Sequence, residues 1–267
     1  MNFKYESYNE LLIELGQVDY IIELNELANR ELKSKFEESS DKEALLEEIC
    51  KKHKIIVNYD SLETIQGKMT LSYIAFVYHT VEAFFYKFKD EYNKIQGYSG
   101  EEKLKFISGK TKLQQLLNYF EPRFNAKDKI DEHLIDTFNY YHQLRVKFSH
   151  PKTTSTAEIE TKYVTANKHR VKLGSEFNLV HSPKKISEID FEDFFLFTRV
   201  SKEIARLFST ICLPTPAKII VYLKLERFKK YSDEKRIKTA IQNELVQKFR
   251  INIDYAEDYI NEIYKEI

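Results

Sequence analysis

Apolar residues recur at helical spacing along most of this chain. Val77 and Tyr78 follow Ile74 by three and four residues, and Val81 follows it by seven, which predicts a long amphipathic helix over residues 70–88. The same spacing predicts further helices over residues 8–32, 42–54, 102–120, 130–149 and 191–212, one that begins near Ser232 and one that begins at Asp254. With only six glycines and five prolines in 267 residues, long helices joined by short connections are favoured over a turn-rich barrel or sandwich. The sequence therefore predicts a mainly α fold.

One segment, residues 152–187, is the exception to this helical period. Ile159, Thr161 and Tyr163 alternate with polar neighbours, residues 166–169 offer a turn, and the apolar residues that follow can form a returning strand. This alternation predicts a β-hairpin inserted between two helices of the main bundle.

The predicted hairpin is rich in basic residues. Four of its cations are candidates for binding RNA phosphates: Lys152, Lys168, Arg170 and Lys172. The alternative is a solvated hairpin that only covers the end of the bundle, because charge runs usually mark exposed surface.

The helical pattern divides the chain into three parts. Residues 1–67 form a predicted N-terminal helical extension, residues 68–213 a helical bundle that contains the insert, and residues 214–267 a C-terminal helical extension. Pro214 and Pro216 interrupt the helical pattern where the C-terminal extension begins. Neither extension carries a catalytic signature, so packing, dimerisation and partner binding are equally open roles for both.

Composition narrows the class of protein further. The chain has 42 lysine and arginine residues and 42 aspartate and glutamate residues, and this zero net charge argues against binding nucleic acid over the whole surface. Cys50 and Cys212 lie far apart without metal-ligand spacing, which indicates a reducing compartment and predicts neither a metal site nor a cofactor. No signal-peptide pattern and no apolar run long enough for a bilayer is present, so we expect a cytoplasmic protein with no membrane contact.

The end of the predicted helix over residues 130–149 carries the most unusual pair of polar residues. Phe138 and Tyr141 lie on one apolar arc of this helix, and Arg145 falls near the centre of the same arc. An arginine in that position is expected to pair with a carboxylate or to line a cleft that receives an anion. His150 follows at the end of the helix, where Pro151 disfavours helical geometry, so the last turn can open and bring the imidazole towards the arginine.

An arginine and a histidine separated by four residues, at the end of the third of four helices, resemble the signature of the HEPN superfamily. The resemblance covers about residues 68–213. It implies a four-helix bundle and a metal-independent endoribonuclease that acts as a homodimer, in which two motif ends meet. It also implies a toxin or antiviral-defence effector that cuts RNA, with an antitoxin or another regulatory protein as a possible partner.

Two positions differ from the pattern of active members. Val146 follows the arginine where a polar residue is common, which leaves catalysis open. Pro151 and Lys152 follow the histidine, so the tyrosine that a partner nucleotidyltransferase modifies in one branch is absent here. Regulation by that route is therefore disfavoured.

The chemistry assigned to the pair follows from the side chains and the resemblance together. His150 is expected to exchange a proton with the ribose 2′-hydroxyl or with the leaving oxygen, since histidine titrates near neutral pH. Arg145 is expected to stabilise the charge on the phosphorane-like transition state with its planar donor fork. Four neighbours are candidates for supporting roles: Glu82 as the partner of Arg145, His142 near the same arc, and Lys147 and Tyr141 as contacts for phosphate or base.

Two other functions remain open. If Arg145 is sealed in a salt bridge with Glu82 or another carboxylate and His150 only caps the helix, the protein is a non-catalytic helical module that binds RNA, a nucleotide or a partner protein. A third possibility is a structural interaction protein that acts through its terminal helices.

Overall fold

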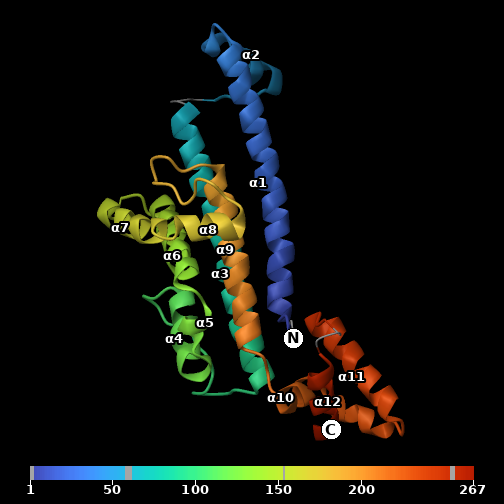
Figure 1. Ribbon diagram of the computed structural model, residues 1–267. Helices are drawn as coiled ribbons and strands as arrows, with labels where there is room; N and C mark the ends of the chain where they lie inside the picture. The colour runs from blue at the N-terminus through green and yellow to red at the C-terminus, as the bar shows by residue number, and fades with distance from the viewer. Residues whose placement is uncertain (1–2, 58–61, 153, 253–255) are drawn as a thin grey trace. The chain divides into compact units, whose positions relative to one another are not determined.

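The computed structural model describes residues 3–57, 62–152, 154–252 and 256–267 (Figure 1). The described residues form helices and connecting segments and contain no β-strand, which confirms the predicted mainly α fold. The helices are α1 Glu6–Glu38, α2 Lys42–His53, α3 Leu62–Gln96, α4 Lys112–Phe124, α5 Ala126–Lys129, α6 Glu132–Ser149, α7 Thr156–Asn167, α8 Arg170–Phe177, α9 Phe191–Ile211, α10 Pro216–Leu223, the 3₁₀ helix η1 Leu225–Lys230, α11 Glu234–Phe249 and α12 Glu257–Glu266.

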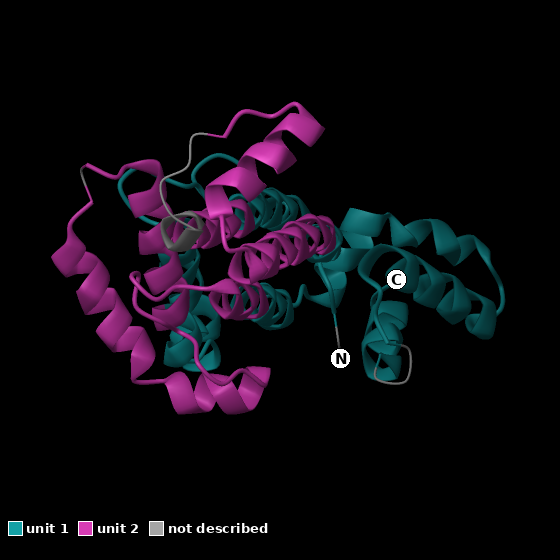
Figure 2. Cartoon of the chain, turned by 90° about the horizontal axis from the view of Figure 1, so that it is seen from above, with its two compact units in different colours: residues 1–13, 79–135, 200–267 teal, residues 14–78, 136–199 magenta. Residues whose placement is uncertain are grey.

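The chain forms two compact units (Figure 2). Unit 1 comprises residues 1–13, 79–135 and 200–267, and unit 2 comprises residues 14–78 and 136–199. The helices α1, α3, α6 and α9 each contribute residues to both units. The predicted boundaries near residues 67 and 213 stay a prediction.

Unit 1 is built around a cluster of aromatic rings. The Phe88 ring of α3 lies 4.9 Å from the ring of Tyr5, 6.1 Å from that of Phe120 and 5.9 Å from that of Phe208, measured between centroids. The Tyr5 hydroxyl donates a 2.7 Å hydrogen bond to the carbonyl of Cys212, so the polar end of this buried tyrosine is satisfied. Such rings bury large apolar areas, and this cluster joins α3, α4 and α9 to the start of the chain.

The start of α1 is held by a carboxylate from α3. Both oxygens of Glu91 accept 2.8 Å hydrogen bonds, one from the backbone N–H of Glu6 and the other from that of Ser7. These are N–H groups of the first helical turn, which have no partner inside the helix. Burial raises the pKa of the Glu91 carboxyl, while the hydrogen bonds from Ser7 act in the opposite direction.

The predicted β-hairpin is wrong, because the residues that were expected to form it fold as α7 and α8. Ile159 and Ala166 are buried on α7, seven positions apart, so the buried residues of this segment follow a helical period and not the period of a strand. Threonine does not prevent this helix: the Thr161 and Thr165 hydroxyls donate hydrogen bonds of 2.9 and 3.0 Å to carbonyls one turn earlier. The alternation of polar and β-branched residues therefore reflected an exposed helix face.

The helix predicted over residues 102–120 begins ten residues later, at Lys112 of α4. The side chain of Thr111 accepts a hydrogen bond from the Gln114 N–H and so caps the helix. The segment before it is held as a loop by the buried Asn93, whose amide bonds both the N–H and the carbonyl of Leu104, at 2.8 and 3.0 Å. The Asn93 side chain thus provides hydrogen-bond partners for the backbone of Leu104, in a segment that the periodicity of the sequence had assigned to a helix.

The predicted helix that begins near Ser232 is confirmed as α11, which Asp233 caps by accepting a hydrogen bond from the Lys235 N–H. The four apolar residues used for that prediction are all buried: Ile237, Ile241, Leu245 and Phe249. The predicted start of the last helix, at Asp254 and Tyr255, lies outside the described residues. Among the described helices, none is long and apolar enough to cross a bilayer by itself, and α9 and α10 reach that limit only together, across a bend.

Candidate functional site

The predicted motif lies at the C-terminal end of α6, in unit 2. Leu144 is fully buried, Arg145 is half-buried and His150 is exposed. The backbone N–H of His150 still donates a 2.8 Å hydrogen bond to the carbonyl of Val146, so the helical pattern reaches the histidine before Pro151 ends it. Arg145 and His150 thus occupy the last turns of one helix, with the histidine side chain at the surface.

A network of carbonyl contacts closes this end of α6. The His150 carbonyl accepts hydrogen bonds from the backbone N–H and the hydroxyl of Thr154, at 3.3 and 3.0 Å. The Lys147 ammonium donates to the carbonyls of Pro151 and Thr154, at 2.7 and 3.3 Å. Lys147, predicted to contact phosphate or base, is therefore placed as a cation that satisfies carbonyls after the helix end.

Arg145 lies against an aromatic ring. Its guanidinium carbon is 4.9 Å from the centroid of the Tyr78 ring on α3. The His142 ring packs against the same tyrosine, with centroids 4.9 Å apart and planes inclined by 45°. Among the described residues of unit 2, Arg145 forms no salt bridge, so that unit provides no carboxylate to neutralise it. Glu82 belongs to unit 1, and its pairing with Arg145 stays a prediction.

His142 is the strongly perturbed titratable group beside the arginine. Burial, and after it the positive charges of Arg145 and Lys162, lower the pKa of its imidazole from 6.5 to about 4. The imidazole is therefore neutral at physiological pH and has one donor and one acceptor nitrogen. Such a group can orient a neighbour or a ligand, but it cannot supply a proton as an acid at neutral pH.

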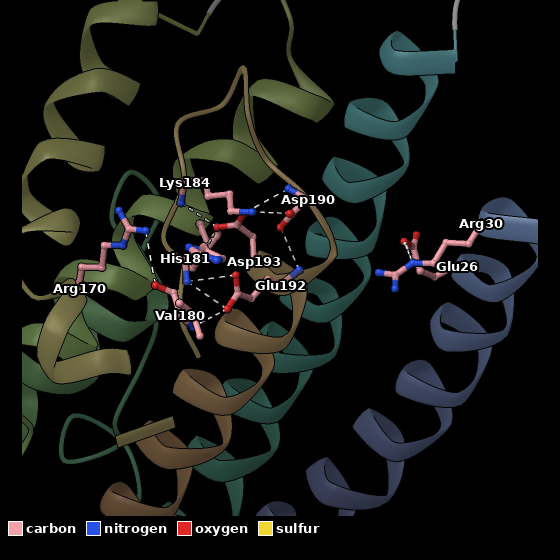
Figure 3. Close-up of polar contacts among 10 residues, drawn as sticks. Glu26, Arg30, Arg170, Val180, His181, Lys184, Asp190, Glu192 and Asp193 are labelled. Carbon is pink, nitrogen blue, oxygen red and sulfur yellow. Dashed lines mark hydrogen bonds and ion pairs between the residues drawn. The ribbon is translucent and has the colours of Figure 1, made fainter. Parts of the chain in front are cut away.

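Tyr141 is placed in the core of unit 2. Its buried hydroxyl donates a 2.7 Å hydrogen bond to Oδ1 of Asp193 on α9, and its ring lies 5.1 Å from that of Phe197. Asp193 also accepts hydrogen bonds from the backbone N–H groups of Lys184, at 3.0 Å, and Asp190, at 3.2 Å (Figure 3). The structure therefore gives Tyr141 a packing and hydrogen-bonding role inside the unit.

Asp193 was not identified from the sequence. It is fully buried, and burial raises the pKa of its carboxyl from 3.8 to about 6, although its three hydrogen bonds favour the charged form. The available signal was an acidic residue inside the aromatic run of residues 191–197, but an acid in the first turn of a helix is also an ordinary surface feature.

The segment before α9 is fixed to the start of that helix by carboxylates (Figure 3). The carboxylate of Glu192 accepts hydrogen bonds from the backbone N–H groups of Val180, at 2.6 Å, and His181, at 3.2 Å. The Lys184 ammonium forms an ion pair with Asp190. A basic side chain of this segment is thus compensated by an acidic neighbour.

Of the four predicted RNA-binding cations, Arg170 lines a surface hollow whose lining does not include the other three. Lys152, Lys168 and Lys172 are exposed. Arg170 is half-buried and donates a long 3.5 Å hydrogen bond to the Val180 carbonyl. It lines the hollow, of about 370 Å³, together with Tyr163, His181, Pro183, Lys184 and Glu188. Because Glu188 is negative, Arg170 is positive and Lys184 is neutralised by Asp190, this hollow has a mixed electrostatic character.

The insert is also tied to the motif helix. His169, at the start of α8, lies 3.1 Å from Oδ2 of Asp136 on α6, measured from its Nε2 atom. The Lys185 ammonium lies 3.8 Å from Glu160 of α7. The elements α6, α7 and α8 therefore present the motif end and the basic insert within the same compact unit.

Comparison of this chain with protein-family models, with curated proteins and with solved structures finds no match.

Proposed function

We propose that the protein is a metal-independent endoribonuclease of HEPN type. The observation that supports this most directly is the environment of Arg145, whose half-buried guanidinium lies on the Tyr78 ring without a carboxylate partner in unit 2. A cation in such a place favours the approach of an anion. An exposed histidine follows at the end of the same helix, where it is accessible to a polynucleotide.

The proposed reaction is an internal phosphoryl transfer within RNA. His150 accepts the proton of a ribose 2′-hydroxyl, and the resulting oxygen attacks the adjacent phosphorus. The bond from phosphorus to the 5′-oxygen breaks, that oxygen takes up a proton, and a 2′,3′-cyclic phosphate remains. Arg145 donates hydrogen bonds to the non-bridging phosphate oxygens, on which negative charge accumulates in the transition state.

The proposed reaction uses one base and one acid. His142 is a poor second group, because its pKa of about 4 leaves it without a proton to donate at neutral pH. A second copy of His150 is the better source of the acid, and this is the reason to propose a homodimer in which two motif ends face one RNA strand. Lys152, Lys168, Arg170 and Lys172 are proposed to bind the RNA backbone beside the motif.

The cellular role rests on the resemblance alone. A ribonuclease of this type would act in the cytoplasm as a toxin or antiviral-defence effector that cuts RNA. An antitoxin or another regulatory protein would then control it.

A non-catalytic module that binds RNA, a nucleotide or a partner protein is the second candidate. Val146 beside the arginine favours it, and so does the network in which the His150 carbonyl and Lys147 close the end of α6. In that case, the motif residues would stabilise the helix end and would not perform chemistry.

Incubation of the purified protein with labelled total RNA and tRNA in the presence of EDTA distinguishes the two. The test variants are Arg145→Ala and His150→Ala. The matched controls are Arg123→Ala, which removes another arginine stacked on a tyrosine, 4.3 Å from the Tyr119 ring, and His53→Ala, which removes another exposed histidine. Folding of each is checked by circular dichroism.

Cleavage by the parent and both controls, lost in both test variants, would support the nuclease. No cleavage by the parent, or equal cleavage by all five proteins, would overturn it and favour the binding module.

A further inference from the structure

Helix α1 has two apolar faces, and the described residues of the chain cover only one of them. Its buried face includes Leu11, Leu15, Ile22 and Phe36. Tyr20, Leu24 and Leu27 lie on the opposite side, about 175° away at 100° per residue. These three side chains are 55–68% exposed, which is unusual for adjacent large apolar residues on one helix.

The exposed residues form a seam with the spacing of a coiled coil. Ile13, Tyr20, Leu24 and Leu27 follow one another at intervals of seven, four and three residues. Ile13 is also exposed, and Ile21 widens the seam on one side. Isolated apolar side chains are common on protein surfaces, but a heptad-spaced row on a helix of 33 residues fits another helix.

The charges of α1 indicate which helix fits. Residues 6–26 contain six acidic side chains and no basic one, whereas the rest of α1, residues 27–38, contains three basic and three acidic side chains. Two parallel copies of α1 would place acid beside acid. Two antiparallel copies avoid this repulsion, because the acidic part of each helix then lies beside the part of the other that carries the three basic side chains and has no net charge.

We propose that the exposed seam of α1 docks against the same seam of a second copy of this chain, in antiparallel orientation. The two-fold axis passes between Tyr20 and Leu24, so that Tyr20 packs against the partner's Leu24 and Ile21 lies beside the partner's Ile21. On the same side of the seam, Glu10 then lies beside the partner's Lys35.

The existing ion pairs of these residues do not oppose this arrangement. Glu10 pairs with Lys87 at 2.8 Å and Lys35 pairs with Glu31 at 3.2 Å, but all four side chains are well exposed. Exposed pairs of this kind contribute little and exchange partners easily. The apolar core of the interface is small, so the dimer is expected to dissociate on dilution.

This inference does not rest on the proposed nuclease, because the seam contains neither Arg145 nor His150. It assigns the dimer contact to the N-terminal helix, whereas the proposed reaction only requires that two motif ends meet.

Sedimentation velocity over a range of protein concentrations tests the seam. The parent chain is expected to shift from monomer to dimer, and Leu24→Glu is expected to weaken this association at least tenfold. Leu24→Ala is the milder variant if Leu24→Glu does not fold, and it is expected to weaken the dimer to a smaller degree. Val171→Glu is the control, because Val171 is an apolar residue of α8 that is 87% exposed outside the seam. A parent that stays monomeric, or dimerisation that is equal in the Leu24 variants and the parent, would overturn the proposal.

The orientation has a separate test. Lys35→Glu is expected to weaken the dimer by placing two acids together, and the double variant Glu10→Lys with Lys35→Glu is expected to restore it. Failure of the double variant to recover association would overturn the antiparallel register.

Discussion

The hydroxyl of Tyr141 donates a 2.7 Å hydrogen bond to the carboxylate of Asp193, and both side chains are completely buried. This contact joins α6, which carries the motif, to the first turn of α9. The same carboxylate holds the backbone of Lys184 and Asp190. One buried acid therefore fixes the motif helix, the helix α9 and the segment that precedes α9.

Replacing Tyr141 by phenylalanine is expected to destabilise the protein without changing its fold. The variant keeps the volume of the ring but removes one of the three donors to Asp193, and a hydrogen bond to a charged group contributes about 1.5–3 kcal/mol. The measurement is the apparent free energy of unfolding in urea. Tyr163→Phe is the control, because the described part of the chain offers its hydroxyl no hydrogen bond. An equal effect of both substitutions would contradict the role given to the Asp193 contact.

Asp193→Asn is expected to change how stability depends on pH. The folded-state pKa of about 6 lies above the ordinary 3.8, so the folded state binds the proton more tightly than the unfolded state. This group therefore adds stability as pH falls from 6 towards 4, by up to about 3 kcal/mol for a shift of two units. The variant should lack this gain when unfolding is followed at pH 7, 6, 5 and 4. A difference between parent and variant that is constant with pH would contradict the raised pKa.

His142→Gln is expected to show the opposite pH dependence. The folded-state pKa of about 4 lies below the ordinary 6.5, so the unfolded state takes up the proton first as pH falls. As pH falls from 6.5 to 4, this group therefore lowers the parent's free energy of unfolding by up to about 3 kcal/mol. The Gln variant should not show this loss. The two groups partly cancel in the parent between pH 6 and 4, so each single variant should depend on pH more steeply than the parent. The Gln variant should become more stable on acidification relative to the parent, and the reverse result would show that His142 is protonated in the fold.

Helix periodicity predicted the parts of the fold in which the buried face is plain in the sequence. Ile237, Ile241 and Leu245 recur at helical spacing, and all of them are buried on α11. The insert was misassigned because Thr161 and Thr165 suit a strand by propensity, whereas in α7 their hydroxyls bond carbonyls of the preceding turn. Local propensity did not decide this segment; burial of Ile159 and Ala166 on one face did.

The surroundings of the motif depend on contacts between distant residues. The position of Arg145 on an apolar arc predicted a carboxylate partner or a cleft that receives an anion, but the sequence does not specify which helix faces the arginine. In unit 2, Arg145 lies against the Tyr78 ring, 67 positions earlier in the chain. A search of the sequence for a carboxylate partner does not identify this aromatic contact. Likewise, Glu192 and Asp193 are adjacent acids in the first turn of α9, and Asp193 is the buried one, in contact with Tyr141 of α6 and with the backbone of Lys184 and Asp190.

Tyr78→Leu is expected to release Arg145 from its position, because leucine fills much of the space but has no aromatic face for the cation. This can be measured without any activity, through the titration of the His142 imidazole followed by nuclear magnetic resonance. The charge of Arg145 helps to lower the pKa of His142, so this pKa should rise from about 4 when the guanidinium moves away, although burial keeps it below 6.5. Arg145→Ala should raise it in the same way, and Tyr78→Phe, which keeps an aromatic face, should leave it near the parent value.

If the proposed nuclease is correct, the same variants should also differ in RNA cleavage. Tyr78→Phe should retain the parent's kcat, and Tyr78→Leu should reduce kcat about tenfold. A tenfold loss corresponds to roughly 1.4 kcal/mol, which is the contribution of a partly buried cation–π contact. A lowered kcat with an unchanged His142 pKa would mean that Tyr78 acts on the reaction by some route other than holding Arg145.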